Sequence, residues 1–330
     1  MSYCWHKKGV DMIQKFYFLV ILVMTLGFWA CSSSSPSSLA VNNNVHKSVV
    51  KIAILADQGV NGMSAKVLNI VKNQKADMLL INGDFDYKND PVRWERLNRD
   101  ILGEDFPILA VVGNHDVPKW SEYQKIIQRW QQNPKFSCSG EVGVMNSCTF
   151  EGVKIVLSSP GIFSGLSKVE NENFIKNSFA EDKSIWRICG WHKNMKDMQT
   201  GSKSDDAGWG VYEECRKAGA LITTGHEHAY ARSYLLSDIP QKKIVTKSDT
   251  MTLATGQTVV ILSGLGGLSA RPLLHDGAWW AAKENADTGT KGGVLFCSFG
   301  VAGDSREAAC YFMDEVGNRL DTFTLKSALN

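Results

Sequence analysis

Two histidines separated by one residue lie at the end of an apolar run in the last third of the chain. The run at 221–224 predicts a buried strand, and Gly225-His226-Glu227-His228 follows it directly. In extended backbone, positions i and i+2 point to the same side, so both imidazoles can face one site. Gly225 allows the backbone to approach that site closely. Such a pair is equally compatible with two surface histidines, so its interpretation depends on partners elsewhere in the chain.

Polar side chains that can bind metals follow four other apolar runs. These runs predict strands at 49–55, 77–82, 107–112 and 185–190, and the polar residues after their ends are Asp57, Asp84, Asn114 and His192. Expected helices at 64–72 and 91–102 separate the first three strands, which indicates right-handed βαβ crossovers and a parallel sheet. Ligands bind at the carboxyl ends of the strands in such sheets. Each residue alone could be an ordinary turn, core or surface residue, but their shared position after successive strands indicates one binding site.

The order of these residues resembles the motifs of the calcineurin-like metallophosphoesterases, over residues 51–232. The general pattern of that family has D-x-H as its first motif and G-D-x-x-D as its second. Here Gly59 stands in place of the histidine and Tyr87 in place of the last aspartate, which is the pattern of the purple acid phosphatase branch. The five matching segments are Ala56-Asp57-Gln58-Gly59, Gly83-Asp84-Phe85-Asp86-Tyr87, Gly113-Asn114-His115-Asp116, Cys189-Gly190-Trp191-His192 and Gly225-His226-Glu227-His228. Ala56, Asp116 and Cys189 depart from the branch pattern at positions that are not ligands.

The resemblance implies a binuclear metal site with seven protein ligands. Asp57, Tyr87 and His228 would hold a ferric ion, and Asn114, His192 and His226 would hold a divalent ion such as Fe, Zn or Mn. Asp84 would bridge the two ions. The donor atoms agree with this division, because phenolate and carboxylate oxygens suit a hard, highly charged ion, whereas imidazole and amide suit softer divalent metals.

The resemblance also implies an acid phosphatase-like hydrolase of small-molecule phosphate monoesters, in which a metal-bound hydroxide attacks phosphorus in line. His115 is expected to stabilise the transition state or protonate the leaving group, and its alternative role is to orient the neighbouring ligand. Tyr230 and Arg232 are candidate substrate contacts, with packing as an equal alternative. Two other functions stay open, namely a phosphodiesterase or nucleotidase on the same metals, and a non-catalytic surface protein that keeps the fold.

The fold class implied by the resemblance is α/β, a four-layer α/β/β/α sandwich with two mixed β-sheets. Further helices are expected at 120–130, 171–179 and 212–218, a hairpin at 148–158, and strands at 258–262, 293–299 and 309–325, the last with a turn at 317–318. A hydrophobic content of 44% suits a sizeable core. The formal net charge is only +2, which gives no sign of the basic patch that a nucleic-acid binder normally carries.

The N-terminal segment has the features of an export signal. Lysines precede an apolar run at 16–30, which is short for a membrane span but fits the apolar region of a signal peptide. Ala30-Cys31 and the serines that follow resemble a bacterial lipoprotein cleavage site. We therefore expect a signal at 1–30, a flexible tether at 31–47 and a catalytic domain at 48–330, in a lipoprotein of the bacterial cell envelope or periplasm. Secretion after cleavage at Ala40 and an uncleaved anchor are the alternatives.

Six cysteines lie beyond the targeting segment. An even number in an exported protein favours disulfides. Cys138 with Cys148, and Cys297 with Cys310, are close enough in sequence to close hairpins, which leaves Cys189 with Cys215. Six free, mostly buried thiols are the alternative.

Overall fold

The computed structural model describes residues 49–330. The expected export signal at 1–30, with Cys31 and the tether at 31–47, lies outside the described residues. Within 49–330, no helix has both the length and the apolar character that crossing a bilayer requires.

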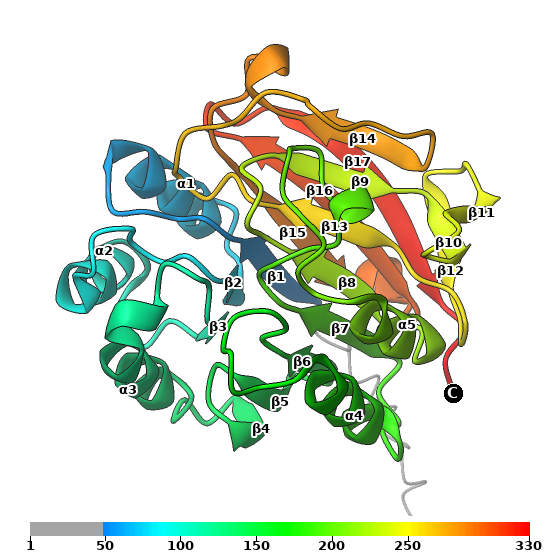
Figure 1. Ribbon diagram of the computed structural model, residues 1–330, viewed down its shortest axis with the longest axis horizontal. Helices are drawn as coiled ribbons and strands as arrows, with labels where there is room; N and C mark the ends of the chain where they lie inside the picture. The colour runs from blue at the N-terminus through cyan, green and yellow to red at the C-terminus, as the bar shows by residue number, and fades with distance from the viewer. Residues whose placement is uncertain (1–48) are drawn as a thin grey trace, which may run out of the picture. The chain divides into compact units, whose positions relative to one another are not determined.

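Two mixed β-sheets form the centre of the domain (Figure 1). In spatial order, the first sheet contains β12 (Thr250–Leu253), β17 (Arg319–Ser327), β16 (Glu307–Asp314), β15 (Gly293–Phe299), β1 (Val50–Leu55), β2 (Met78–Asn82) and β3 (Ile108–Val111). The second contains β14 (Trp280–Glu284), β9 (Tyr230–Ser233), β13 (Val260–Ser263), β8 (Leu221–Thr224), β7 (Trp186–Gly190), β6 (Val153–Leu157), β5 (Met145–Phe150) and β4 (Phe136–Glu141). A separate ribbon pairs β10 (Leu235–Asp238) with β11 (Lys243–Thr246).

Three of the four apolar clusters within residues 49–330 hold the layers together. One core lies between the sheets, the second packs the first sheet against three helices, and the third packs the second sheet against two more. The helices are α1 (Gly62–Asn73), α2 (Pro91–Leu102), α3 (Trp120–Trp130), α4 (Lys168–Phe179) and α5 (Trp209–Lys217). Side chains alternate along each strand, so Ile52 and Ile54 of β1 enter the core between the sheets while Ala53 and Leu55 face the helices. This is the expected α/β/β/α arrangement.

The parallel strands place their carboxyl ends on one edge of each sheet. β1, β2 and β3 are parallel neighbours, as are β6, β7, β8 and β13. Polar residues follow the ends of β1, β2, β3, β7 and β8, as the sequence predicts. On the other side of β1, the strands β15, β16 and β17 follow one another in antiparallel pairs, β12 is parallel to β17, and none of these strands is followed by an expected ligand.

Most expected elements are present, and the differences concern short strands. α2 and α3 begin and end where the sequence predicts. Six strands were not predicted: β4, β9, β10, β11, β12 and β14. Five of them have four or five residues, which is too short for a clear pattern of alternation, and the longer β4 is exposed and polar.

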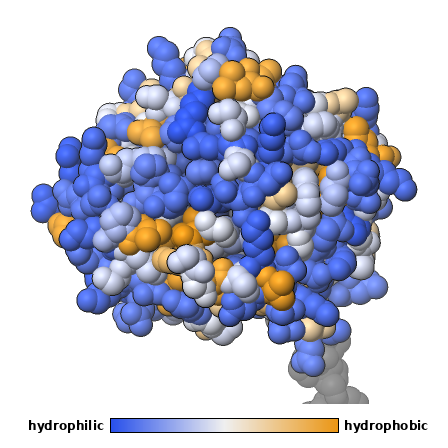
Figure 2. All heavy atoms as spheres, viewed as in Figure 1, coloured by the Kyte–Doolittle hydropathy of each residue, from blue (hydrophilic) through white to orange (hydrophobic). Residues whose placement is uncertain are grey.

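The face drawn in Figure 2 is largely hydrophilic, with its apolar residues in small groups.

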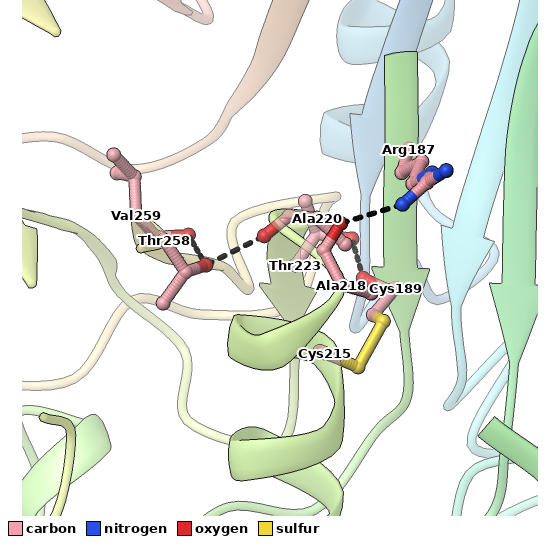
Figure 3. The surroundings of a disulfide bond; sticks show 8 residues. All are labelled: Arg187, Cys189, Cys215, Ala218, Ala220, Thr223, Thr258 and Val259. Atoms are coloured by element: carbon pink, nitrogen blue, oxygen red, sulfur yellow. Dashed lines mark hydrogen bonds between the residues drawn. A yellow bond between two sulfur atoms is a disulfide. The ribbon is translucent and has the colours of Figure 1, made fainter. Parts of the chain in front are cut away.

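Three disulfides join the cysteines in the expected pairs. Cys138–Cys148 links directly opposed residues of β4 and β5, and Cys297–Cys310 does the same for β15 and β16. Cys189–Cys215 ties β7 to α5 (Figure 3). The last bond fixes the helix against a strand that ends beside the candidate site. Three disulfides indicate an oxidising compartment.

Candidate metal centre

A cluster of buried acid and imidazole groups lies where the strand ends meet. Donor atoms of Asp84, His192 and His226 all lie within 4.8 Å of one another. Asp84 follows β2, His192 follows β7 and His226 follows β8, so the cluster joins the two sheets. Oδ2 of Asp84 is 3.2 Å from Nε2 of His192. The three residues form a buried Asp/His metal-binding cluster.

A second group of expected ligands lies beside this cluster. The Tyr87 hydroxyl donates to Oδ1 of Asp57 at 2.8 Å and lies 3.2 Å from Nε2 of His228. Nε2 of His228 is in turn 3.6 Å from the same Asp57 oxygen. The other Asp57 oxygen accepts the backbone N–H of His226 at 2.9 Å, so the two groups are in direct contact.

Three buried oxygen and nitrogen atoms of the site have no hydrogen-bond partner within residues 49–330. They are Oδ1 of Asn114, Nε2 of His192 and Nδ1 of His226. Nε2 of His192 is near Asp84, but the two atoms do not have hydrogen-bonding geometry. Buried polar atoms without partners are rare because they lose the hydrogen bonds that water would provide. All three can donate a lone pair to a cation, so the donor set fits a metal ion.

The histidine rings are oriented from behind. Nδ1 of His192 lies 2.8 Å from the carbonyl oxygen of Asn82, and Nδ1 of His228 lies 3.0 Å from that of Ser269. A carbonyl oxygen accepts only from a protonated nitrogen, so both rings present an unprotonated Nε2 to the site when they are neutral. Carbonyl partners of this kind are typical of metal-binding histidines.

The backbone of the site is held in an uncommon conformation. Asp57, Asp84, Tyr87 and His226 have φ values of 56°, 56°, 59° and 73°, a region that residues other than glycine rarely adopt. Strain of this kind concentrates at functional sites and needs support from its surroundings. A Cβ atom at Gly113 would lie 2.2 Å from the backbone nitrogen of Asp84, so only glycine permits the close approach of these two loops.

Asp116 supplies much of that support, a role that the sequence did not reveal. Its side chain is fully buried and accepts backbone N–H groups from Gly113 at 2.7 Å, Asp84 at 2.9 Å and Phe85 at 2.8 Å. These bonds join the loop after β3 to the loop after β2. The sequence shows Asp116 only as a departure from the branch pattern, since its partners Phe85 and Asp84 lie 31 and 32 residues earlier in the chain.

Burial and mutual charge determine the protonation of the site. Burial opposes a charge on His192, but the adjacent Asp84 carboxylate outweighs it and raises the pKa of His192 to about 9. Burial likewise acts to raise the pKa of Asp84, yet the charge of His192 holds it well below its usual range. Burial raises the pKa of Asp57 to about 7 and lowers that of His228 to about 4. A metal ion must displace the proton of His192, so metal binding weakens as the pH falls.

His115 lies at the open side of the site. Its imidazole is exposed, and the ring centroid is 4.6 Å from that of Tyr87. Its backbone N–H donates to Oδ1 of Asp84 at 2.9 Å. The backbone of His115 therefore orients Asp84, and its side chain remains free to meet a substrate.

Tyr230 and Arg232 have a different environment from the one expected of substrate contacts. Both side chains are buried. The Tyr230 hydroxyl donates to Oδ2 of Asp321 at 2.7 Å, and Arg232 binds both oxygens of Asp321 at 2.7 and 2.9 Å. Tyr230 also stacks on Phe312 between the two sheets. These contacts favour the packing alternative for both residues, and a contact with substrate stays a prediction.

One further charged pair adjoins the histidines. Glu227 is buried, and its Oε2 lies 3.3 Å from Nη1 of Arg271. The same Arg271 nitrogen is 3.4 Å from the carbonyl oxygen of His226. The pair fixes the turn between His226 and His228. Arg271 was not predicted, because it belongs to a loop more than forty residues further along the chain.

Comparison with known families agrees with this geometry. The model of the family described as calcineurin-like phosphoesterase matches residues 50–230, more than half of the chain. The chain therefore belongs to the calcineurin-like phosphoesterases. No curated protein matches the sequence.

Solved structures of low sequence identity share the fold. A purple acid phosphatase from yellow lupin (Lupinus luteus) seeds is similar with a TM-score of 0.62 and 16% identity, over 84% of this chain and 54% of that chain. GAP50, the anchor in the inner membrane complex of Plasmodium, has a TM-score of 0.57 and 14% identity, over 84% and 89% of the two chains. PhoD has a TM-score of 0.50 and 10% identity, over 83% and 72%. This chain spans about half the length of the lupin protein, and at these identities the likeness shows the fold alone.

Proposed function

We propose that the protein hydrolyses phosphate monoesters in the manner of an acid phosphatase, with two metal ions at this site. The observation that carries the proposal is the set of partnerless buried donor atoms on Asn114, His192 and His226, beside the Asp57–Tyr87–His228 group. These six residues and the bridging Asp84 form a complete set of ligands. When bound, two ions would neutralise the phosphoryl oxygens and lower the pKa of a water molecule for in-line attack on phosphorus.

The residues of the chain have separate tasks in this reaction. Asp84 belongs to the cluster with His192 and His226, and its charge also acts on Asp57 of the second group. Its carboxylate would therefore bridge the two cations. His115 is positioned to contact the phosphoryl group or to donate a proton to the departing oxygen of the ester, since its imidazole is exposed beside Tyr87. Hydrolysis breaks the bond between phosphorus and the ester oxygen, and the products are an alcohol and inorganic phosphate.

Tyr87 supports a metal pair of the purple acid phosphatase type. Burial and the neighbouring Asp57 raise the pKa of Tyr87 well above its ordinary value, so only a strongly polarising cation would convert it to a phenolate ligand. Fe(III) does so well because its charge and hardness both favour anionic oxygen. We therefore assign Fe(III) to Asp57, Tyr87 and His228, and a divalent Fe, Zn or Mn ion to the other three ligands.

The experiment that tests this proposal compares two synthetic esters on purified protein of measured metal content. We expect faster hydrolysis of p-nitrophenyl phosphate, a monoester, than of bis(p-nitrophenyl) phosphate, a diester. Preference for the diester would favour the phosphodiesterase alternative. Hydrolysis of neither ester or of any nucleotide by metal-loaded protein would favour a non-catalytic role, and GAP50 is described as an anchor on a similar fold.

We also propose that the protein is exported and anchored by a lipid on Cys31. The support is the apolar run that precedes Ala30-Cys31, together with the disulfides of the domain. Cys31→Ala should move the protein from the membrane fraction to the soluble fraction. Membrane retention of this variant would favour an uncleaved anchor, and a mature N-terminus at Val41 in the wild type would favour ordinary secretion.

A further inference from the structure

Two polar side chains meet in the apolar core between the sheets, next to the metal centre. Met78 and Leu80 of β2 enter this core, and Leu221 of β8 enters it from the other sheet. Because side chains alternate along a strand, Asn82 at the end of β2 and Thr223 of β8 point into the same core. Both are fully buried. Nδ2 of Asn82 donates to Oγ1 of Thr223 at 3.0 Å, so this hydrogen bond joins the two sheets.

The bond is part of a relay formed by Asn82, Thr223 and Cys189. The Thr223 hydroxyl donates to the carbonyl oxygen of Cys189 in β7 at 3.2 Å (Figure 3), so its oxygen is free to accept from the Asn82 amide. Cys189 is fixed to α5 by its disulfide with Cys215. At the other end of the relay, the carbonyl oxygen of Asn82 lies 2.8 Å from Nδ1 of His192. The relay therefore connects a helix, both sheets and one expected metal ligand.

The strands joined by the relay are the ones that carry the buried Asp/His cluster. Each relay residue is followed within two or three positions by one ligand of that cluster, namely Asp84 after Asn82, His192 after Cys189 and His226 after Thr223. The intervening backbone is closely packed. A Cβ atom at Gly83 would lie 2.7 Å from Nδ1 of His192, and one at Gly225 would lie 2.8 Å from the carbonyl oxygen of Asn82. A shift of β2 against β8 would therefore move the ligands as well.

The stability of the fold does not account for this polar pair. Oδ1 of Asn82 is buried and has no hydrogen-bond partner within residues 49–330, which costs folding free energy. This oxygen faces β7, since a Cβ atom at Gly190 would lie 2.7 Å from it. Replacement of both polar partners by apolar groups of the same shape is nearly neutral for stability. The pair must therefore contribute something other than stability.

We propose that Asn82 and Thr223 are positioning residues that set the spacing of the Asp84, His192 and His226 ligands, and thereby the affinity of this site for its divalent ion. The inference rests on the proposed binuclear site and adds two residues to it that are not ligands. Asp84 belongs to one sheet and the two histidines to the other, so their spacing depends on how the sheets are joined. Apolar packing is not directional, whereas a hydrogen bond fixes both distance and angle.

Removal of the Thr223 hydroxyl tests the proposal. Thr223→Val keeps the shape of the side chain and should raise the dissociation constant for Zn²⁺ about tenfold, as loss of a supporting contact does at other metal sites. Thr223→Ser keeps the hydroxyl and should bind Zn²⁺ within about twofold of the wild type, because the hydrogen bonds can still form. Isothermal titration measures both constants, after a chelator has removed exchangeable divalent ions from the protein.

Thr258→Val is the matched control. Thr258 is also fully buried, and its hydroxyl donates to the carbonyl oxygen of Ala220 at 2.6 Å (Figure 3). This bond lies at the opposite end of β8 from the ligands, so its loss should reduce stability to urea and leave Zn²⁺ affinity unchanged. Equal Zn²⁺ affinity in Thr223→Val and Thr258→Val would overturn the inference and leave the metal site intact. If the wild type binds none of Zn²⁺, Mn²⁺ and Fe²⁺, the proposed function fails and the inference fails with it.

A double variant separates positioning from folding. Asn82→Leu combined with Thr223→Val replaces both partners by apolar side chains, so stability to urea should exceed that of Thr223→Val alone. The Zn²⁺ dissociation constant should remain about tenfold above that of the wild type, because the directional contact between β2 and β8 is still absent. Recovery of Zn²⁺ affinity together with stability would give the pair a purely structural role and overturn the inference.

Discussion

Two buried polar clusters of this domain differ in the kind of atom that is left without a hydrogen-bond partner. At the metal centre, the partnerless atoms are Oδ1 of Asn114 and ring nitrogens of His192 and His226, all of which can donate a lone pair. In the cluster of Tyr230, Arg232 and Asp321, the carboxylate is saturated by three donors. Within residues 49–330, the atom of this second cluster that has no hydrogen-bond partner is Nη1 of Arg232, which is a hydrogen-bond donor.

The comparison shows how a binding site differs from a structural ion pair of similar burial. A cluster that lacks acceptors for its donors cannot be completed by a cation, whereas a cluster with free lone pairs can. Each cluster contains candidate functional residues at or just after the turn at 225–228, namely His226 and His228 in the metal centre and Tyr230 and Arg232 in the other cluster. The two clusters are distinguished by whether their atoms without partners carry free lone pairs or N–H groups. Four substitutions test whether that distinction holds.

The largest effect is expected at Asp84. Asp84→Asn removes the negative charge that would hold two cations together, so phosphatase turnover should be abolished, as measured on metal-loaded protein with p-nitrophenyl phosphate. The variant should still give the circular dichroism spectrum of the wild type. Turnover near that of the wild type in a folded variant would exclude Asp84 as the bridge.

His115→Ala should have the next largest effect. Its exposed imidazole is outside the set of ligands, so metal content should stay at the wild-type level while turnover falls about 10²-fold, the usual contribution of a positioned acid. Tyr230→Phe serves as the control, because it removes a polar group at the start of β9 that contacts Asp321 and should keep turnover. Wild-type rates for His115→Ala would leave His115 with the orienting role of its backbone only.

A substitution in the cluster of Tyr230, Arg232 and Asp321 should lower the stability of the fold and leave turnover unchanged. Asp321→Ala leaves the buried Arg232 guanidinium without its principal partner, and removal of one member of a buried ion pair costs about 3 kcal/mol of unfolding free energy or more. Urea denaturation measures that loss. Turnover per folded molecule should be unchanged, and a selective loss of turnover at normal stability would instead return Arg232 to the substrate site.

The sequence reveals the metal centre because its signals are local. Each expected ligand follows an apolar run directly, and Asp57, Asp84 and Asn114 need only the rule that parallel strands end at one edge. The structure brings all seven expected ligands to that edge. The partners of Tyr230 and Arg232 could not be predicted in the same way, because Asp321 lies about ninety residues further on.

The supporting residues were missed for the same physical reason. Ser269 and Arg271 contact the GHEH turn from a loop whose sequence has no regular pattern. Asp116 acts through backbone N–H groups, which every residue possesses, so nothing in its partners' side chains marks the interaction. Short strands such as β9 and β14 form by pairing with distant segments, β9 with β13 and β14 with β9, and their own sequences are too brief to indicate it.

Tyr87→Phe has the smallest expected effect on the site as a whole. The phenol contacts Asp57 and His228, so its loss should weaken the iron site and remove the visible absorption of a phenolate–iron pair. The ligands Asn114, His192 and His226 remain, and the divalent ion should stay bound. Unchanged colour in this variant would assign the absorption to another group.

The metal content of the purified, oxidised protein tests the central claim most directly. Elemental analysis after removal of loosely bound ions should give about two metal ions per chain, of which one is iron, and the protein should be pink or purple. Colourless, active protein that contains only divalent metal would contradict the ferric assignment and leave the phosphoesterase function in place. Folded protein that binds no metal at any concentration tested would contradict the account of the site itself.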